Sequence, residues 1–64
     1  MSSKTIEALE FAIKAESESR ARYEKMAKEA EDPETRLICE QFAREENNHY
    51  KVLSNRLKAL KLLG

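Results

Sequence analysis

Glu31-Asp32-Pro33-Glu34 is the one break in a sequence that otherwise has the periodicity of α-helices. Asp32 suits a helix N-cap, because its short carboxylate accepts hydrogen bonds from the free backbone amides at a helix start. Pro33 suits the first helical position, where no amide donor is needed, and Glu34 adds favourable negative charge there. The motif therefore predicts a helix that begins at residue 33 after a short connection over about residues 31–32.

Apolar residues recur on both sides of this break with the spacing of one helix face. A first helix is predicted from about residue 4 to 30, with Ser2 or Ser3 as its N-cap, and a second from about residue 33 to 62. A short connection between long helices makes them antiparallel neighbours. The fold class is therefore all-α, with residues 1–64 as a single helical hairpin. The residues predicted to face inward are Ile6, Leu9, Ala12, Ile13, Glu16, Arg20, Tyr23, Met26, Ala27 and Ala30, and then Ile38, Cys39, Phe42, Glu46, His49, Leu53, Arg56 or Leu57, and Leu60.

Length and composition narrow the classes of function. The 12 acidic and 12 basic residues cancel without a basic cluster, so nucleic acid is not an expected partner. A membrane span needs about 20 apolar residues, and neither such a run nor a signal-peptide pattern is present. Cys39 is the single cysteine, which suits a small buried apolar role and a reducing cytoplasm. A chain of 64 residues is marginal alone, so a metal or oligomerisation is expected to stabilise it.

Ionisable residues interrupt the inward faces at matching positions. A charge at the centre of an apolar face is costly unless it is paired or bound to a metal. Glu46 and His49 stand three residues apart, so they share one face of the second helix. Glu16 lies about 15 residues before the turn and Glu46 about 15 residues after it. Glu16, Glu46 and His49 are therefore predicted to meet at one level of the hairpin and to bind a metal ion.

Three ligands are too few to complete a metal site, and a lone hairpin leaves its apolar faces in water. Two hairpins packed about a two-fold axis form a four-helix bundle that solves both problems. Such a homodimer gathers two copies each of Glu16, Glu46 and His49, the ligand set of di-iron and di-manganese carboxylate bundles. Two iron ions per dimer are therefore predicted, with manganese and zinc as alternatives.

The same residues resemble those of a known family. The segment Glu16-Ser17-Glu18-Ser19-Arg20-Ala21-Arg22-Tyr23 is similar to the Glu-Ser-x-Ala-Arg-x-x-Tyr run of rubrerythrin-like proteins, and Glu46-Asn47-Asn48-His49 matches their Glu-x-x-His. Over about residues 5–60 the chain resembles the ferritin-like superfamily, closest to rubrerythrins and two-helix encapsulated ferritins. The resemblance implies that Glu16, Glu46 and His49 are iron ligands and that Tyr23 forms a hydrogen bond near the metal.

Two further groups are interpreted from their positions. Arg20 follows Glu16 by four residues, so it either pairs with a neighbouring carboxylate or offsets the negative charge of the ligand cluster. Glu18 and Glu45 lie off the inward faces and are interpreted as solvated or peripheral to the site. The chain departs from rubrerythrins in having two helices where they have four, and no Cys-x-x-Cys module.

The predicted function is ferroxidase-like binding and oxidation of Fe(II), for iron storage or detoxification, with Glu16, Glu46 and His49 as the metal-binding and catalytic residues. A hairpin dimer cannot enclose a mineral, so storage requires a larger ring or an enclosing protein shell in the cytoplasm. Two alternatives remain open. The metal could staple a structural or interaction hairpin without turnover, or the site could reduce peroxide with an external electron donor, as rubrerythrins do.

Overall fold

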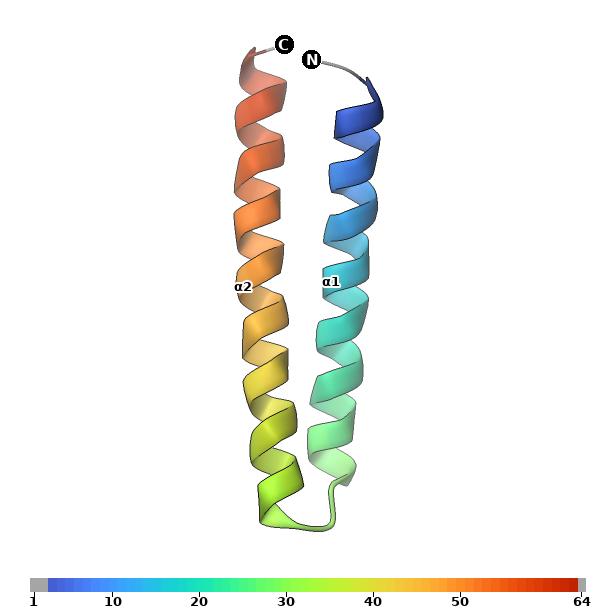
Figure 1. Cartoon of the computed structure of the whole chain (residues 1–64), viewed down its shortest axis with the longest axis vertical. Coiled ribbons are helices and arrows are strands. Elements are labelled where there is room, and N and C mark those ends of the chain that lie inside the picture. Colours follow the sequence, from blue (N-terminus) through green and yellow to red (C-terminus); the bar gives the residue numbers. More distant parts are fainter. Residues whose placement is uncertain (1–2, 64) are drawn as a thin grey trace.

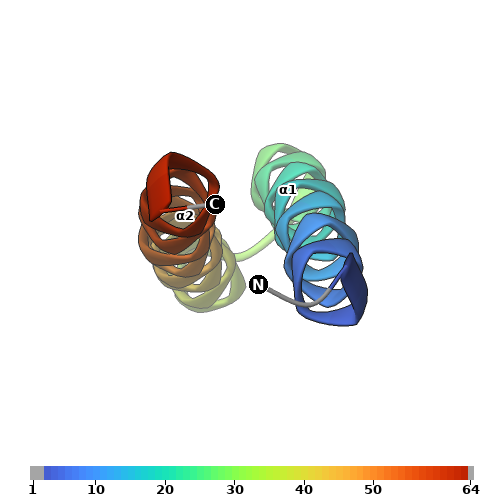
Figure 2. The same ribbon diagram turned by 90° about the horizontal axis from the view of Figure 1, so that it is seen from above.

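The computed structural model describes residues 3–63 and contains two α-helices in this range. Helix α1 spans Ser3–Glu29 and helix α2 spans Pro33–Leu63. The helices run antiparallel, so the start of α1 and the end of α2 lie at the same end of the molecule (Figure 1). Seen from above, the two axes are inclined to one another (Figure 2). The prediction of an all-α hairpin is confirmed. The alternative cap Ser2 lies outside the described residues, as do Met1 and Gly64.

The turn has the geometry that the Asp-Pro motif predicts. The backbone amide of Thr35 donates a hydrogen bond of 2.8 Å to Asp32 Oδ2, which is the side-chain contact of an N-cap. The amide of Arg36 donates to the carbonyl oxygen of Asp32 at 3.2 Å and so makes the first hydrogen bond of the helix. Pro33 is the first helical residue. The motif therefore starts α2 and reverses the chain within three residues, 30–32.

Asp32→Ala is expected to lower the melting temperature of the metal-free protein by several degrees, because the amide of Thr35 loses its acceptor. That backbone hydrogen bond lowers the pKa of Asp32 below its ordinary value of 3.8. A lowered folded-state pKa gives stability that is complete above the unfolded-state pKa and is lost as pH falls through the folded-state value.

Asp32→Asn is the matched control, because it keeps an acceptor oxygen that does not titrate. Thermal unfolding followed by circular dichroism should show the advantage of wild type over Asp32→Asn shrinking as pH falls below the ordinary pKa of Asp32. An Asp32→Ala protein with the wild-type melting temperature would contradict the capping role.

The two helices meet through mostly small side chains. Among residues 3–63, those buried in the hairpin are Ala27, Cys39, Ala43 and Leu60, each less than one-tenth exposed. Three of these four residues are small, so the helix backbones can approach closely in the half of the hairpin nearest the turn. Cys39 is buried and free of a disulfide, as expected for a small apolar residue. The hairpin thus buries little bulky apolar surface of its own.

One face of the hairpin remains open and apolar. Ile38 is 46% exposed and Phe42 39%, and their spacing places them on the same side of α2 as His49. From α1, Tyr23 packs edge-to-face against Phe42, with 5.2 Å between ring centroids, and Met26 is 49% exposed one turn away. This set, Tyr23, Met26, Ile38 and Phe42, is called the open apolar face below. Residues predicted to face inward are therefore only partly covered by the other helix.

The overall dimensions agree with an uncovered hairpin. The molecule measures 48 × 14 × 10 Å. Its accessible surface is 5074 Å², whereas a compact monomer of the same mass would expose about 4,200 Å². No helix within residues 3–63 is long and apolar enough to cross a lipid bilayer. The hairpin therefore exposes more surface than a compact protein of its mass.

Candidate metal centre

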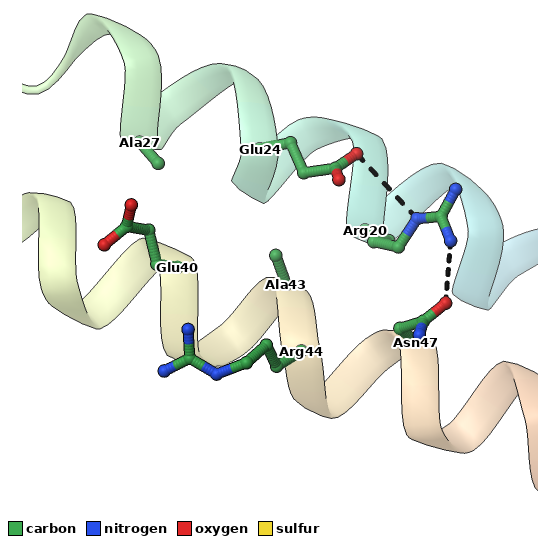
Figure 3. Close-up of a pocket in the computed structure, with 7 residues that line it drawn as sticks. All are labelled: Arg20, Glu24, Ala27, Glu40, Ala43, Arg44 and Asn47. Atoms are coloured by element: carbon green, nitrogen blue, oxygen red, sulfur yellow. Dashed lines mark hydrogen bonds and ion pairs between the residues drawn. The ribbon is translucent and has the colours of Figure 1, made fainter.

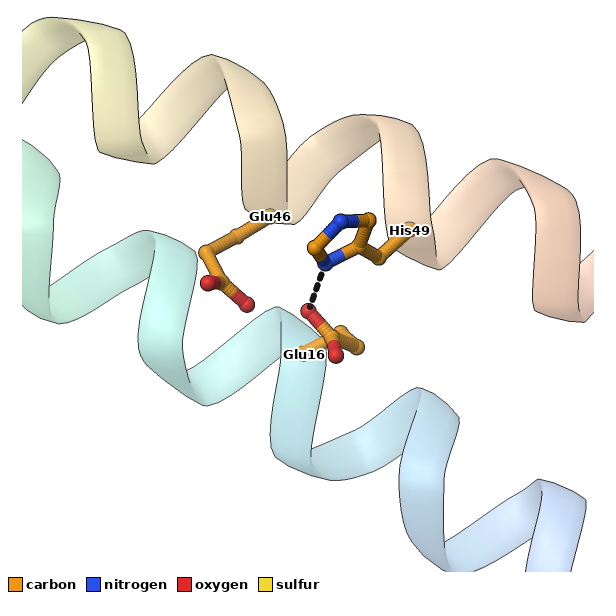
Figure 4. Close-up of side chains that lie close together, drawn as sticks. All are labelled: Glu16, Glu46 and His49. Carbon is orange, nitrogen blue, oxygen red and sulfur yellow. Dashed lines mark hydrogen bonds and ion pairs between the residues drawn. The ribbon is translucent and has the colours of Figure 1, made fainter.

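The structure brings together the three residues that the sequence places at one level. Glu16 reaches across from α1, and Glu46 and His49 reach from successive turns of α2 into the space between the helices (Figure 4). One ligand atom from each residue lies within 4.8 Å of those of the other two. Two carboxylates and an imidazole therefore converge halfway along the hairpin, where no residue of the turn or of the helix ends takes part.

The imidazole contacts the carboxylate of the opposite helix. His49 Nδ1 lies 3.3 Å from Glu16 Oε2 and donates to it when the proton is on Nδ1. The side chain of Glu16 is 23% exposed, whereas that of His49 is 58% exposed. The difference arises because His49 lies on the side of α2 that carries Ile38 and Phe42, which α1 covers only in part. The Glu16 side of the site is therefore mostly shielded from solvent, whereas the His49 side, next to the open apolar face, is accessible to solvent.

The two carboxylates perturb one another. A hydrogen bond with Glu16 raises the pKa of Glu46, and desolvation and the negative charge of Glu16 raise it further. The carboxyl group of Glu46 therefore keeps its proton to higher pH than an isolated glutamate would. A metal ion bound by both groups displaces that proton, so metal affinity should increase as pH rises through the pKa of Glu46.

The distances and the donor atoms fit a metal ion. Bonds from first-row metals to carboxylate oxygen or imidazole nitrogen are about 2.0–2.2 Å, so two donors on one ion lie at most about 4.4 Å apart. The ligand atoms lie within 4.8 Å of one another, so small rotations of the side chains would bring them to this separation. Two oxygens and one nitrogen suit iron and manganese better than a metal that seeks thiolates. Three donors are fewer than iron or manganese usually takes, so a bound ion would need further ligands.

A comparison with protein families matches residues 7–63 to rubrerythrin. The chain belongs to the rubrerythrin family. This family is part of the ferritin-like superfamily, so the resemblance found in the sequence is confirmed, and membership implies iron binding. Comparisons with curated proteins and with solved structures gave no match. The family and the Glu16, Glu46 and His49 cluster thus agree on a di-iron carboxylate protein as the class.

In the described part of this rubrerythrin-family hairpin, Tyr23 packs against Phe42 and does not form the expected hydrogen bond near the metal site. Its ring meets Phe42 at an interplanar angle of 81°. Its hydroxyl forms no hydrogen bond within residues 3–63. The hydrogen bond near the metal that the resemblance implies therefore stays a prediction for the assembled site.

Arg20 makes its contacts away from Glu16. Its Nη1 donates a hydrogen bond of 2.7 Å to Asn47 Oδ1 on α2, and its Nε lies 3.8 Å from Glu24 Oε1 on α1 (Figure 3). Arg20 thus pairs with a carboxylate one turn away, as expected, but the partner is Glu24 and not Glu16, from which the spacing was counted. Asn47 was not singled out in the sequence. The one signal that could have drawn attention to it is its place directly after Glu46.

The other acidic residues near the motifs are not part of the cluster. Glu45 is exposed and accepts a hydrogen bond of 3.2 Å from Gln41 Nε2 on the outer side of α2. Glu18 is exposed and lies beside Phe11 and Lys14 on α1. Both positions agree with the solvated role expected for them. Within residues 3–63, Glu16, Glu46 and His49 therefore form the one group of side chains that could hold a metal ion.

Proposed function

We propose that this protein is a homodimer that binds two Fe(II) ions and oxidises them at a site built from both chains. The observation that carries the proposal is the cluster of Glu16, Glu46 and His49, with ligand atoms within 4.8 Å, in a chain of the rubrerythrin family. Iron is the substrate of this reaction, and the three side chains are its ligands. Two-fold pairing doubles the set to four carboxylates and two imidazoles.

The position of the cluster supports the dimer. His49 is largely exposed and lies on the same side of α2 as Ile38 and Phe42. A second hairpin packed on the open apolar face would bury these apolar side chains and bring its own His49 and glutamates to the same place. The dimer thus covers the excess surface and completes the coordination in one step.

The reaction needs two metal ions held close together. Two Fe(II) ions bound by shared carboxylates together supply the two electrons that reduce O2 to hydrogen peroxide, with two protons taken from solvent. Glu16 and Glu46 neutralise the charge that builds up when the ions become ferric. Metal binding requires the Glu46 carboxylate to be deprotonated, so its raised pKa means that iron binding weakens as pH falls.

Aerobic titration of the wild-type protein with Fe(II) tests the proposal. We expect ferric absorbance to rise faster than in protein-free buffer, with a break at one Fe per chain, because each dimer has two ions and two chains. Anaerobic titration should give the same stoichiometry without the absorbance. Iron that stays ferrous in air, or a break far from one per chain, would contradict the ferroxidase proposal.

A second function is favoured by the exposed apolar surface. The hairpin lacks a large core, so metal bound at the centre of a dimer would stabilise the assembly by mass action even without turnover. In that case metal addition should raise the melting temperature while Fe(II) stays reduced in air. The same titration therefore separates a catalytic site from a structural staple.

A further inference from the structure

A second contact links the helices on the side of the hairpin away from His49. The hydrogen bond from Arg20 Nη1 to Asn47 Oδ1, at 2.7 Å, is the shorter of the two cross-helix contacts measured at this level; the other is His49 Nδ1 to Glu16 Oε2 at 3.3 Å. It lies at the edge of a groove of about 450 Å³ that none of the candidate ligands lines. Figure 3 shows Arg20 crossing from α1 to meet Asn47.

Both residues of this hydrogen bond lie close in sequence to a predicted metal-binding residue. Asn47 directly follows Glu46, and Arg20 is one helical turn after Glu16. Adjacent residues of a helix point about 100° apart, so when Asn47 is held toward the groove, Glu46 points between the helices. A rotation of α2 about its axis would break the bond and turn Glu46 away from Glu16.

The surrounding packing does little to prevent that rotation. The nearest buried residues are Ala27 and Ala43, which contribute single methyl groups and no interlocking ridge. Within the groove, Glu24 contacts Arg20 only from its own helix, and the buried Nε of Arg20 has no hydrogen bond there. On the groove side, the directional restraint between the helices is therefore the bond from Arg20 to Asn47.

We propose that Arg20 and Asn47 are positioning residues that fix the rotation of α2 relative to α1 and so hold Glu16, Glu46 and His49 in metal-binding geometry. This inference rests on the proposed function, because the geometry that it explains is that of the metal site. The contact that it concerns, between Arg20 and Asn47, lies outside that site. It assigns the two residues no contact with the metal. Their effect passes through the backbone of α2.

Asn47→Ala removes the acceptor and is the first variant to test. We expect Co(II), used as a spectroscopic probe, to bind about tenfold more weakly, with an altered absorption spectrum, because ligand sets tolerate only small displacements. Arg20→Met should give the same change, because it keeps the apolar stem and loses the donors. Asn47→Asp should restore wild-type affinity, since it keeps an oxygen acceptor for Arg20.

Asn48→Ala is the matched control, since it makes the same change at the exposed neighbouring residue and should leave Co(II) binding unaltered. A purely structural role would lower the melting temperature of Asn47→Ala without changing the Co(II) affinity or spectrum. That result would overturn the inference.

A measurement on the metal-free protein keeps this inference separate from the proposed function. The nuclear Overhauser effect between the His49 ring and the Glu16 side chain should be present in wild type and weakened in Asn47→Ala. If wild type bound no metal, the proposed function would fail, and a weakened effect would still support positioning. An unchanged effect would refute positioning even in a protein that oxidises iron.

Discussion

His49→Ala is expected to reduce the rate of aerobic Fe(II) oxidation to that of protein-free buffer, and Glu46→Ala to do the same. In a two-fold dimer each substitution removes a ligand from both ions. Loss of a partner that only hydrogen-bonds to a ligand lowers metal affinity by about 10–100-fold, so loss of the ligand itself should exceed a factor of about 100. Stopped-flow absorbance measures the oxidation rate, and anaerobic titration measures Fe(II) affinity.

Glu45→Ala is the control for these variants. It removes the same charge from the residue next to Glu46, but Glu45 is exposed and contacts Gln41 outside the cluster. It should therefore oxidise iron at the wild-type rate. A His49→Ala protein that keeps the wild-type rate would remove His49 from the site, and equal losses in Glu45→Ala and Glu46→Ala would indicate a general effect of charge.

The fold could be predicted because its signals are local. Asp32 and Pro33 act on the backbone within a few residues, and the structure shows both in the predicted roles. Long amphipathic segments on either side left only an antiparallel arrangement, since the connection is too short for any other. Neither inference needed knowledge of a partner.

The meeting of the site residues followed from counting along two helices. An antiparallel hairpin places residues at equal distances from the turn side by side, which brought Glu16 level with Glu46 and His49. The count fixes the level of a residue but not the direction of its side chain. That Glu16, Glu46 and His49 bind metal stays a prediction, which membership of the rubrerythrin family supports.

The contacts of Arg20 and Tyr23 could not be obtained in this way. Counting places Arg20 opposite Ala43, whereas its long side chain reaches one turn further to Asn47. Tyr23 and Phe42 both belong to the open apolar face, and whether their rings meet depends on the rotation of each helix about its axis. Such contacts depend on side-chain length and rotation, which periodicity does not specify.

Phe42→Glu is expected to produce a folded monomer that binds little iron. Phe42 is 39% exposed in the hairpin, and in the proposed dimer the second chain buries the rest. Full burial of a Phe contributes about 1.5–3 kcal/mol, so burying the exposed 39% of Phe42 from both chains contributes about 1–2 kcal/mol to association, a factor of about 5–50. The added charge opposes burial further. Analytical ultracentrifugation gives the mass, circular dichroism the helix content, and anaerobic titration the bound iron.

Phe11→Glu is the matched control, since Phe11 is 78% exposed and lies beside Lys14 and Glu18 on another side of α1. It should remain dimeric and retain one iron per chain. A Phe42→Glu protein that stays dimeric with full iron would mean that the partner covers a different face. A monomer that still binds and oxidises iron would mean that one chain completes the site, because the lost half of the ligand set would then be unnecessary.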